Sequence, residues 1–238
     1  MSVNITRAMI MAAGFGTRMR PLTNNIPKPL VKVRGKALLD YVIDRLIEDG
    51  VKTIVINVHY MGDQIREHVA KRKDAEFIIS DESDAILDSG GGIFKALPHF
   101  KNEPFYHANA DTVWVEGAAH ALPRLRAAWD GDKMDALMLL APTVTTVCYD
   151  GRGDFMMDPE GRLSRVPEGR ISPFVWMSIE ILHPRLFAGV TETKFSINPL
   201  WNKAIAKGRL YGQRLDGVWM HIDRPDAVKE SEEYLAYA

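Results

Sequence analysis

The chain has 238 residues, of which 46% are hydrophobic and 26% are charged, and its formal net charge is −1. This length and composition are typical of one α/β domain with a sizeable core. The nearly balanced charge disfavours a global attraction to nucleic acid or anionic membranes. The single cysteine, Cys148, excludes an internal disulfide, and no apolar run is long enough to span a bilayer. We therefore expect a cytoplasmic protein that binds neither nucleic acid nor membrane.

The first half of the sequence alternates between strand-like and helix-like segments. In chain order, they are a strand at 7–13, a helix at 38–49, a strand at 51–60, a helix at 62–71, a strand at 76–80, a helix at 92–97 and a strand at 105–110. Apolar residues in the first helix recur at helical spacing, and Gly50 follows its end. This order predicts a predominantly parallel sheet with helices on its faces.

The second half continues the alternation after an irregular insertion. Its expected elements are a helix between 118 and 129, a strand at 135–144, two hairpin strands within 153–158 and 161–166, a strand at 174–184, and helices at 197–208 and 226–238. The segment 149–173 is rich in Gly, Pro, Asp and Arg, which is typical of turns and short hairpins. We interpret that segment as a small β excursion over one face of the domain.

The loop after the first strand combines two glycines with several cations. A Walker A loop is excluded because no G-x-x-x-x-G-K-[ST] string follows Gly14. A dinucleotide fingerprint is disfavoured because Met19 replaces its third glycine and no acid follows about 20 residues later. The remaining functional interpretation is a loop whose backbone amides bind an anion, with Arg18 and the proline-flanked Lys28 nearby. The alternative is a tight turn at Gly14 and Gly16 and a solvated lysine.

The stretch "MAAGFGTRMRPLTNNIPKPLVKVRGKALLDY" resembles the signature of the sugar-phosphate nucleotidyltransferases. The resemblance extends to "ILDSGGGIFKALP", "NADTVW", "GRGDF" and "GVWMHID", so it covers nearly the whole chain. It implies a doubly wound, Rossmann-like α/β fold and a single domain over 1–238, with a nucleotide-binding part at about 1–117 and a sugar-binding lid part at about 118–238. Lacking the C-terminal repeats of longer relatives, the chain is expected to be a monomer by default.

The resemblance implies that a sugar 1-phosphate reacts with a nucleoside triphosphate to give a nucleotide-sugar and pyrophosphate. The triple glycine, "GRGDF" and the short length are most similar to family members that use UTP and N-acetylmuramate 1-phosphate in peptidoglycan recycling. A mannose-1-phosphate guanylyltransferase is an alternative. A second alternative, from another functional class, is a non-catalytic nucleotide-sugar sensor on the same fold.

Site residues follow from the resemblance position by position. Arg18 and Lys28 are the expected catalytic cations. The nucleotide-binding residues it implies are Ala13, Gly14, Gly16, Thr17, Arg18, Lys28, Asn57, Glu82 and Gly91. For the sugar it implies Asn109, Gly153, Asp154, Ser178 and Asn198, although Ser178 stands where relatives often have glycine.

A divalent cation, Mg²⁺ with Mn²⁺ as a possible substitute, is expected to bridge the triphosphate and a carboxylate. Asp111, in "NADTVW", is the first ligand that the resemblance implies. The family pattern W-x-D-V-G-T aligns on Trp219, which places His221 at the Asp position and Asp223 at the Gly position. The second ligand is therefore either His221 or Asp223, or Asp111 holds the ion with substrate phosphates alone.

Overall fold

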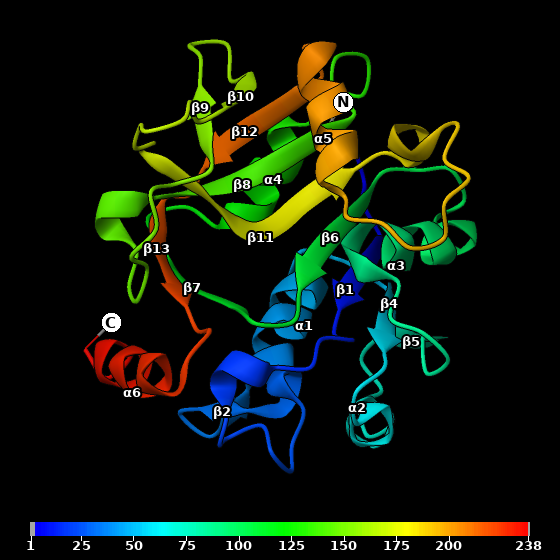
Figure 1. Cartoon of the computed structure of the whole chain (residues 1–238), viewed down its shortest axis with the longest axis vertical. Coiled ribbons are helices and arrows are strands. Elements are labelled where there is room, and N and C mark those ends of the chain that lie inside the picture. Colours follow the sequence, from blue (N-terminus) through cyan, green and yellow to red (C-terminus); the bar gives the residue numbers. More distant parts are fainter. Residues whose placement is uncertain (1–2, 238) are drawn as a thin grey trace.

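A computed structural model describes residues 3–237 of the chain. A nine-stranded sheet runs through the molecule (Figure 1). Seven strands follow one another across the sheet in the order β10 (Leu163–Arg165), β9 (Phe155–Met157), β11 (Phe174–Leu182), β6 (Phe105–Asn109), β1 (Arg7–Met11), β4 (Thr53–Val58) and β5 (Glu76–Asp81). The other two are β8 (Ala136–Pro142), which pairs with β11, and β12 (Leu210–Arg214), which pairs with β8. In the central part only β11 runs against its neighbours, which confirms the mostly parallel sheet.

Helices cover both faces of this sheet, as the sequence predicts. Alternate residues of β1 point to opposite faces, so Ala8 and Ile10 join one apolar cluster and Met9 joins another. The first cluster includes residues of α1 (Leu38–Glu48), α2 (Gly62–Val69) and α4 (Ala121–Ala128), and the second includes residues of α3 (Asp88–Ala96) and α5 (Asn198–Ala206). The doubly wound fold is thereby confirmed. Within residues 3–237, no helix is long and apolar enough to cross a bilayer.

The prediction of a helix at 92–97 was wrong in its start. Helix α3 begins at Asp88, whose φ is +63°, and its three glycines lie within the helix rather than before it. Glycine usually disfavours a helix because of its large backbone entropy. Here the glycines are buried, and their small size permits tight packing, which the sequence pattern does not reveal.

Two small sheets lie beside the large one. Strand β7 (Thr112–Glu116) pairs with β13 (Gly217–His221), strand β2 (Lys32–Val33) pairs with β3 (Lys36–Ala37), and α6 (Pro225–Tyr234) closes the chain. Met19, Val33, Val113 and Met220 form part of a third apolar cluster that joins these elements. We did not predict β7, because only two residues separate it from β6 and the two strands read as one segment.

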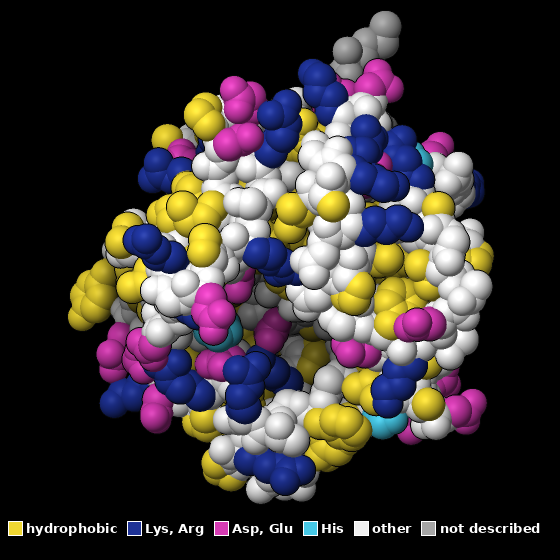
Figure 2. All heavy atoms as spheres, turned by 45° about the horizontal axis from the view of Figure 1, so that its top comes forward, with side chains coloured by type: hydrophobic (Ala, Val, Ile, Leu, Met, Phe, Trp, Pro, Cys, Tyr) yellow, Lys and Arg dark blue, Asp and Glu magenta, His cyan; other side chains and the backbone are white. Residues whose placement is uncertain are grey.

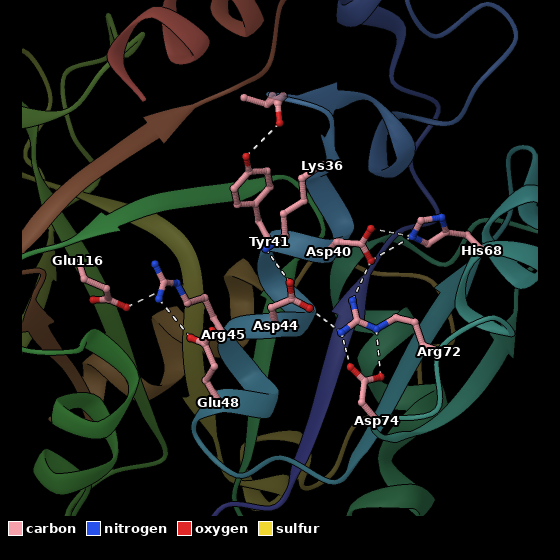
Figure 3. Close-up of polar contacts among 11 residues, drawn as sticks. Lys36, Asp40, Tyr41, Asp44, Arg45, Glu48, His68, Arg72, Asp74 and Glu116 are labelled. Carbon is pink, nitrogen blue, oxygen red and sulfur yellow. Dashed lines mark hydrogen bonds and ion pairs between the residues drawn. The ribbon is translucent and has the colours of Figure 1, made fainter. Parts of the chain in front are cut away.

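A network of ion pairs links α1 to the end of α2 (Figure 3). The Arg72 guanidinium lies 2.9 Å from Asp40 Oδ1, 2.5 Å from Asp44 Oδ1 and 2.6 Å from Asp74 Oδ2. Burial raises the pKa of Asp44, but hydrogen bonds from Lys36 and Arg72 outweigh burial and hold that pKa below its usual value. Arg72 therefore contacts all three carboxylates at the junction of two helices, and Lys36 adds a second cation at Asp44.

We expect Arg72→Ala to lower the free energy of unfolding by about 1–2 kcal/mol, because it removes the guanidinium that the three carboxylates share and leaves only Lys36 beside Asp44. Urea denaturation in low salt measures the loss, which should shrink at high ionic strength. The control is Lys229→Ala, whose ion pair with Glu233 is exposed, and it should change stability by less than about 0.5 kcal/mol. Equal losses in the two variants would contradict this account.

Candidate active site

A cavity of about 270 Å³ opens at the carboxyl ends of β1 and β6. The chain passes from β1 to β4 on one side, whereas β6 lies on the other side of β1, so this is the switch point where open α/β sheets bind ligands. Figure 2 shows side chains of both charges and a histidine around a hollow on one face. Of the sequence-predicted residues, the cavity is lined by Ala13, Gly14, Gly16, Lys28, Asn57, Glu82, Asn109 and Asp111.

The glycine loop presents its backbone to this cavity. Gly16 has a φ of +62°, and a Cβ there would lie 3.0 Å from the Cβ of Lys28. The Thr23 hydroxyl donates a hydrogen bond of 2.7 Å to the Gly16 carbonyl and fixes the turn. Within residues 3–237, the N–H groups of Gly14, Phe15 and Gly16 donate no hydrogen bond. They are therefore available to an anionic ligand.

Lys28 and Asp111 meet in the cavity although 83 residues separate them in the chain. Lys28 begins a short 3-10 turn between Pro27 and Pro29, and its side chain is only 14% exposed. Its Nζ forms an ion pair with Asp111 Oδ2. Each charge is compensated by the other before any ligand is present.

A second pair lies at the rim. Arg18 Nη1 contacts Asp223 Oδ2, but the Arg18 side chain is 72% exposed and neither it nor Thr17 lines the cavity. Strand pairing sets His221 opposite Thr112, and Thr112 directly follows Asp111. The Nε2 atom of His221 lies 4.0 Å from Asp223 Oδ2.

The environment of His221 favours its neutral form. Burial lowers its pKa, Asp223 and Asp111 act in the opposite direction, and Lys28 and Arg18 lower it again. At neutral pH the ring therefore carries a free nitrogen lone pair beside two carboxylates.

Asp111 and Asp223 are the carboxylates of this site that could hold a divalent cation. Within the described residues, no three His, Cys, Asp or Glu side chains are grouped as a metal site, and Asp111 and Asp223 each pair with a cation. Mg²⁺ is usually held by one or two carboxylates together with substrate phosphates. Asp111 and Asp223 are oxygen donors of the kind that this arrangement uses.

Asn57 and Glu82 are buried side chains that line the cavity. The Asn57 Oδ1 accepts a hydrogen bond of 2.7 Å from the Ala12 N–H, and its Nδ2 donates one of 2.7 Å to Glu82 Oε1. The other Glu82 oxygen accepts from the Leu87 N–H at 3.0 Å. This chain of contacts ties the glycine loop to the start of α3.

We expect Asn57→Ala to lower the free energy of unfolding by about 1–3 kcal/mol, because it leaves the buried Ala12 N–H and a Glu82 oxygen without partners. It should also weaken triphosphate binding, since Ala12 begins the glycine loop. Thermal unfolding and nucleotide titration measure the two effects. The control is Asn4→Ala, at an exposed position; a similar loss of stability in both variants would contradict a special role for Asn57.

Gly91, which the sequence places at the nucleotide, does not line this cavity. It lies in a groove between α3 and residues 184–193, and its N–H donates to the Phe195 carbonyl at 3.1 Å. A Cβ at Gly90 would lie 2.3 Å from the Phe195 ring, and one at Gly91 would lie 2.3 Å from the Thr193 carbonyl oxygen. The first two glycines therefore allow the 193–195 segment to pack on α3, and they do not approach the first cavity. In their place, Asp88 and Ser89 line that cavity.

A second cavity of about 240 Å³ adjoins the first, because Ser89 and Asn109 line both. Of the predicted sugar residues, Asp154 and Asn198 also line it. Gly153 and Ser178 line neither cavity. Gly153 has a φ of +78° in a close approach to residues 172 and 174, and Ser178 has a φ of +64° at an irregularity in β11. That left-handed backbone explains why glycine suits position 178.

The second cavity also contains residues that sequence reasoning missed, Arg165, Trp176 and Trp201. They come from β10, β11 and α5, and no motif marks them. Burial raises the pKa of the neighbouring Asp154, while a hydrogen bond from the Trp176 N–H lowers it. This cavity is lined by both polar and aromatic side chains.

The glycine loop lies at the switch point of the sheet, an arrangement that is typical of nucleotide-binding, doubly wound α/β proteins. The chain belongs to the nucleotidyl transferase family, which its residues 7–135 match. It is 40% identical to the N-acetylmuramate alpha-1-phosphate uridylyltransferase of Caulobacter vibrioides over 97% of each chain. The resemblance to sugar-phosphate nucleotidyltransferases drawn from the sequence is confirmed.

Two further comparisons bear on fold and specificity. The mannose-1-phosphate guanylyltransferase catalytic subunit beta of Drosophila melanogaster is 33% identical over 93% of this chain, which spans 60% of that protein. The solved inositol-1-phosphate CTP transferase from T. maritima superimposes with a TM-score of 0.78, covering 99% of this chain and 97% of that one. At 17% identity, this likeness supports the fold alone.

Proposed function

We propose that the chain condenses UTP with N-acetylmuramate 1-phosphate to give UDP-N-acetylmuramate and pyrophosphate, a reaction of peptidoglycan recycling. The observation that carries the chemistry is the Lys28–Asp111 pair beside the free N–H groups of the glycine loop. The choice of substrates rests on the relative that is 40% identical over nearly the full length.

The reaction joins an oxygen of the sugar phosphate to the α-phosphorus and breaks the bond to pyrophosphate. The attacking oxygen is already ionised, so the chain supplies position and charge rather than a general base. The N–H groups of Gly14 to Gly16 bind triphosphate oxygens, and Lys28 stabilises the charge that develops at the α-phosphate. Arg18, at the rim, reaches the β- and γ-phosphates.

Asp111 and Asp223 would hold Mg²⁺ or Mn²⁺ together with the triphosphate, and His221 would orient one of these carboxylates. When bound, this ion neutralises triphosphate oxygens. When the triphosphate binds, Lys28 turns from the Asp111 carboxylate to a phosphate, and the Asp111 carboxylate would then be available to hold the ion. Both charges stay compensated throughout, which avoids the cost of a buried unpaired charge.

The first cavity, between Ala13 and Glu82, takes the nucleotide, and the second takes the sugar. Asn109 lies between the two, and Asp154 and Asn198 provide acceptors and donors for sugar hydroxyl and amide groups. The alternative, a GTP-using mannose-1-phosphate guanylyltransferase, is supported by the Drosophila relative. It would employ the same loop and cations.

Pyrophosphate release tests the proposal. UTP and GTP are each combined with N-acetylmuramate 1-phosphate, N-acetylglucosamine 1-phosphate and mannose 1-phosphate in the presence of Mg²⁺. We expect the fastest release from UTP with the muramate ester. Release from GTP with mannose 1-phosphate would overturn the specificity and keep the chemistry, whereas no release from any pair would favour a nucleotide-sugar sensor.

A further inference from the structure

Arg165 lines the second cavity, and its guanidinium lies over two aromatic rings. Its Cζ is 4.7 Å from the centre of the Phe155 ring and 5.8 Å from that of Trp201. Its Nε donates to Asn202 Oδ1 at 2.9 Å and its Nη2 to Asn198 Oδ1 at 2.7 Å. Two rings and two carboxamides, one ring from β9 and the other three groups from α5, therefore hold one guanidinium in place.

This guanidinium has no acidic partner. Among residues 3–237, no carboxylate lies within 4.0 Å of Arg165, whereas Arg72 alone pairs with three. The two asparagines use two of its five N–H groups, which leaves three without a partner. Burial lowers the pKa of Arg165, although Asp154 opposes that shift. The half-buried Arg165 guanidinium is therefore fixed in the cavity, and three of its N–H groups can still donate hydrogen bonds to a ligand.

The ligand that such a group matches is a carboxylate, which accepts two parallel N–H bonds from a guanidinium. The 1-phosphate of the sugar must lie in the first cavity, near Lys28, where the α-phosphate is bound. A substituent at the far side of the sugar ring would then enter the second cavity past Asn109. N-acetylmuramate carries a lactyl carboxylate that N-acetylglucosamine lacks.

We propose that Arg165 recognises the lactyl carboxylate of N-acetylmuramate 1-phosphate and so selects an acidic sugar over a neutral hexosamine. This inference rests on the proposed function and names the residue that sets its substrate. A neutral sugar in the same place would leave the guanidinium desolvated and without a counter-ion, which disfavours its binding. Asp154, whose Oδ2 accepts from the Trp176 N–H, keeps its other oxygen for a sugar hydroxyl or amide.

The test compares Arg165→Met, Arg165→Lys and the control Arg162→Met. Methionine keeps an apolar side chain over Phe155 and Trp201 and removes the charge, while Arg162 lies on the same hairpin and is exposed. The measurements are kcat/KM for pyrophosphate release and, with a non-hydrolysable UTP analogue present, the Kd of each sugar phosphate by calorimetry.

We expect Arg165→Met to lower kcat/KM for the muramate ester roughly 30-fold, mainly through KM, and to leave the Kd of N-acetylglucosamine 1-phosphate unchanged or up to about threefold tighter, because the uncompensated guanidinium is removed. Arg165→Lys should recover part of the loss, and Arg162→Met should match the wild type. Thermal unfolding of each variant checks that the fold is retained.

Several outcomes would overturn the inference. Equal losses for both sugar phosphates would assign Arg165 to the shared phosphate or to the shape of the cavity. No loss for the muramate ester would show that the two groups do not meet. If the wild type prefers another sugar phosphate, the proposed function itself fails, and that result appears before any variant is compared.

Discussion

Lys28→Ala will lower the rate of pyrophosphate release at least ~100-fold, which corresponds to about 3 kcal/mol of lost transition-state stabilisation. The reason is that Lys28 is the cation inside the cavity, whereas Arg18 is exposed at the rim. Charge that develops at the α-phosphate then has no ammonium beside it. Steady-state kinetics should show the loss mainly in kcat, because the glycine loop and the remaining cations still bind the triphosphate.

The fold should survive this change, since Asp111 is 31% exposed and water can solvate it once Lys28 is removed. Lys32→Ala is the matched control: Lys32 is exposed, lies four residues further on and should leave kcat unchanged. Lys28→Arg keeps the charge in a larger planar group and should recover only part of the rate. Near-normal turnover in Lys28→Ala would remove Lys28 from the mechanism.

The sequence predicts the sheet, the glycine loop and most of the first cavity because these depend on local patterns. Buried parallel strands are continuous apolar runs, and the loop at Gly14 and Gly16 follows the first of them directly. Lys28, Asp111 and Asn57, which line that cavity, could be named from the sequence because they belong to the signature or lie at the ends of predicted strands. The parallel arrangement then places them at one edge.

The parts that could not be predicted depend on long-range packing. The triple glycine reads as a loop, and only the approach of Phe195 and Thr193 shows why α3 needs small residues there. Arg165 reads as one more basic residue of a polar excursion. Its lack of a carboxylate partner and its contacts with Phe155 and Trp201 exist only in the folded chain.

Asp111→Asn will also lower turnover at least ~100-fold, because the carboxamide has the shape of the carboxylate without its charge. Strand pairing fixes Asp111 beside the cavity, one residue before Thr112, which faces His221 across the β7–β13 ribbon. We therefore expect the variant to need a higher Mg²⁺ concentration for half-maximal rate. Titration of the rate with Mg²⁺ and with Mn²⁺ measures this shift.

Asp150→Asn, at an exposed carboxylate of the same domain, is the control and should leave the Mg²⁺ dependence unchanged. In the double variant Lys28→Ala/Asp111→Asn, the two losses should combine to less than their product, because both residues act on one triphosphate and its ion. If the losses multiplied fully, the two side chains would act independently, and the exchange of partners between Lys28 and Asp111 would be wrong. If Asp111→Asn kept both its rate and its Mg²⁺ dependence, the ion would have to be held elsewhere, and Asp223 with His221 would be the next pair to change.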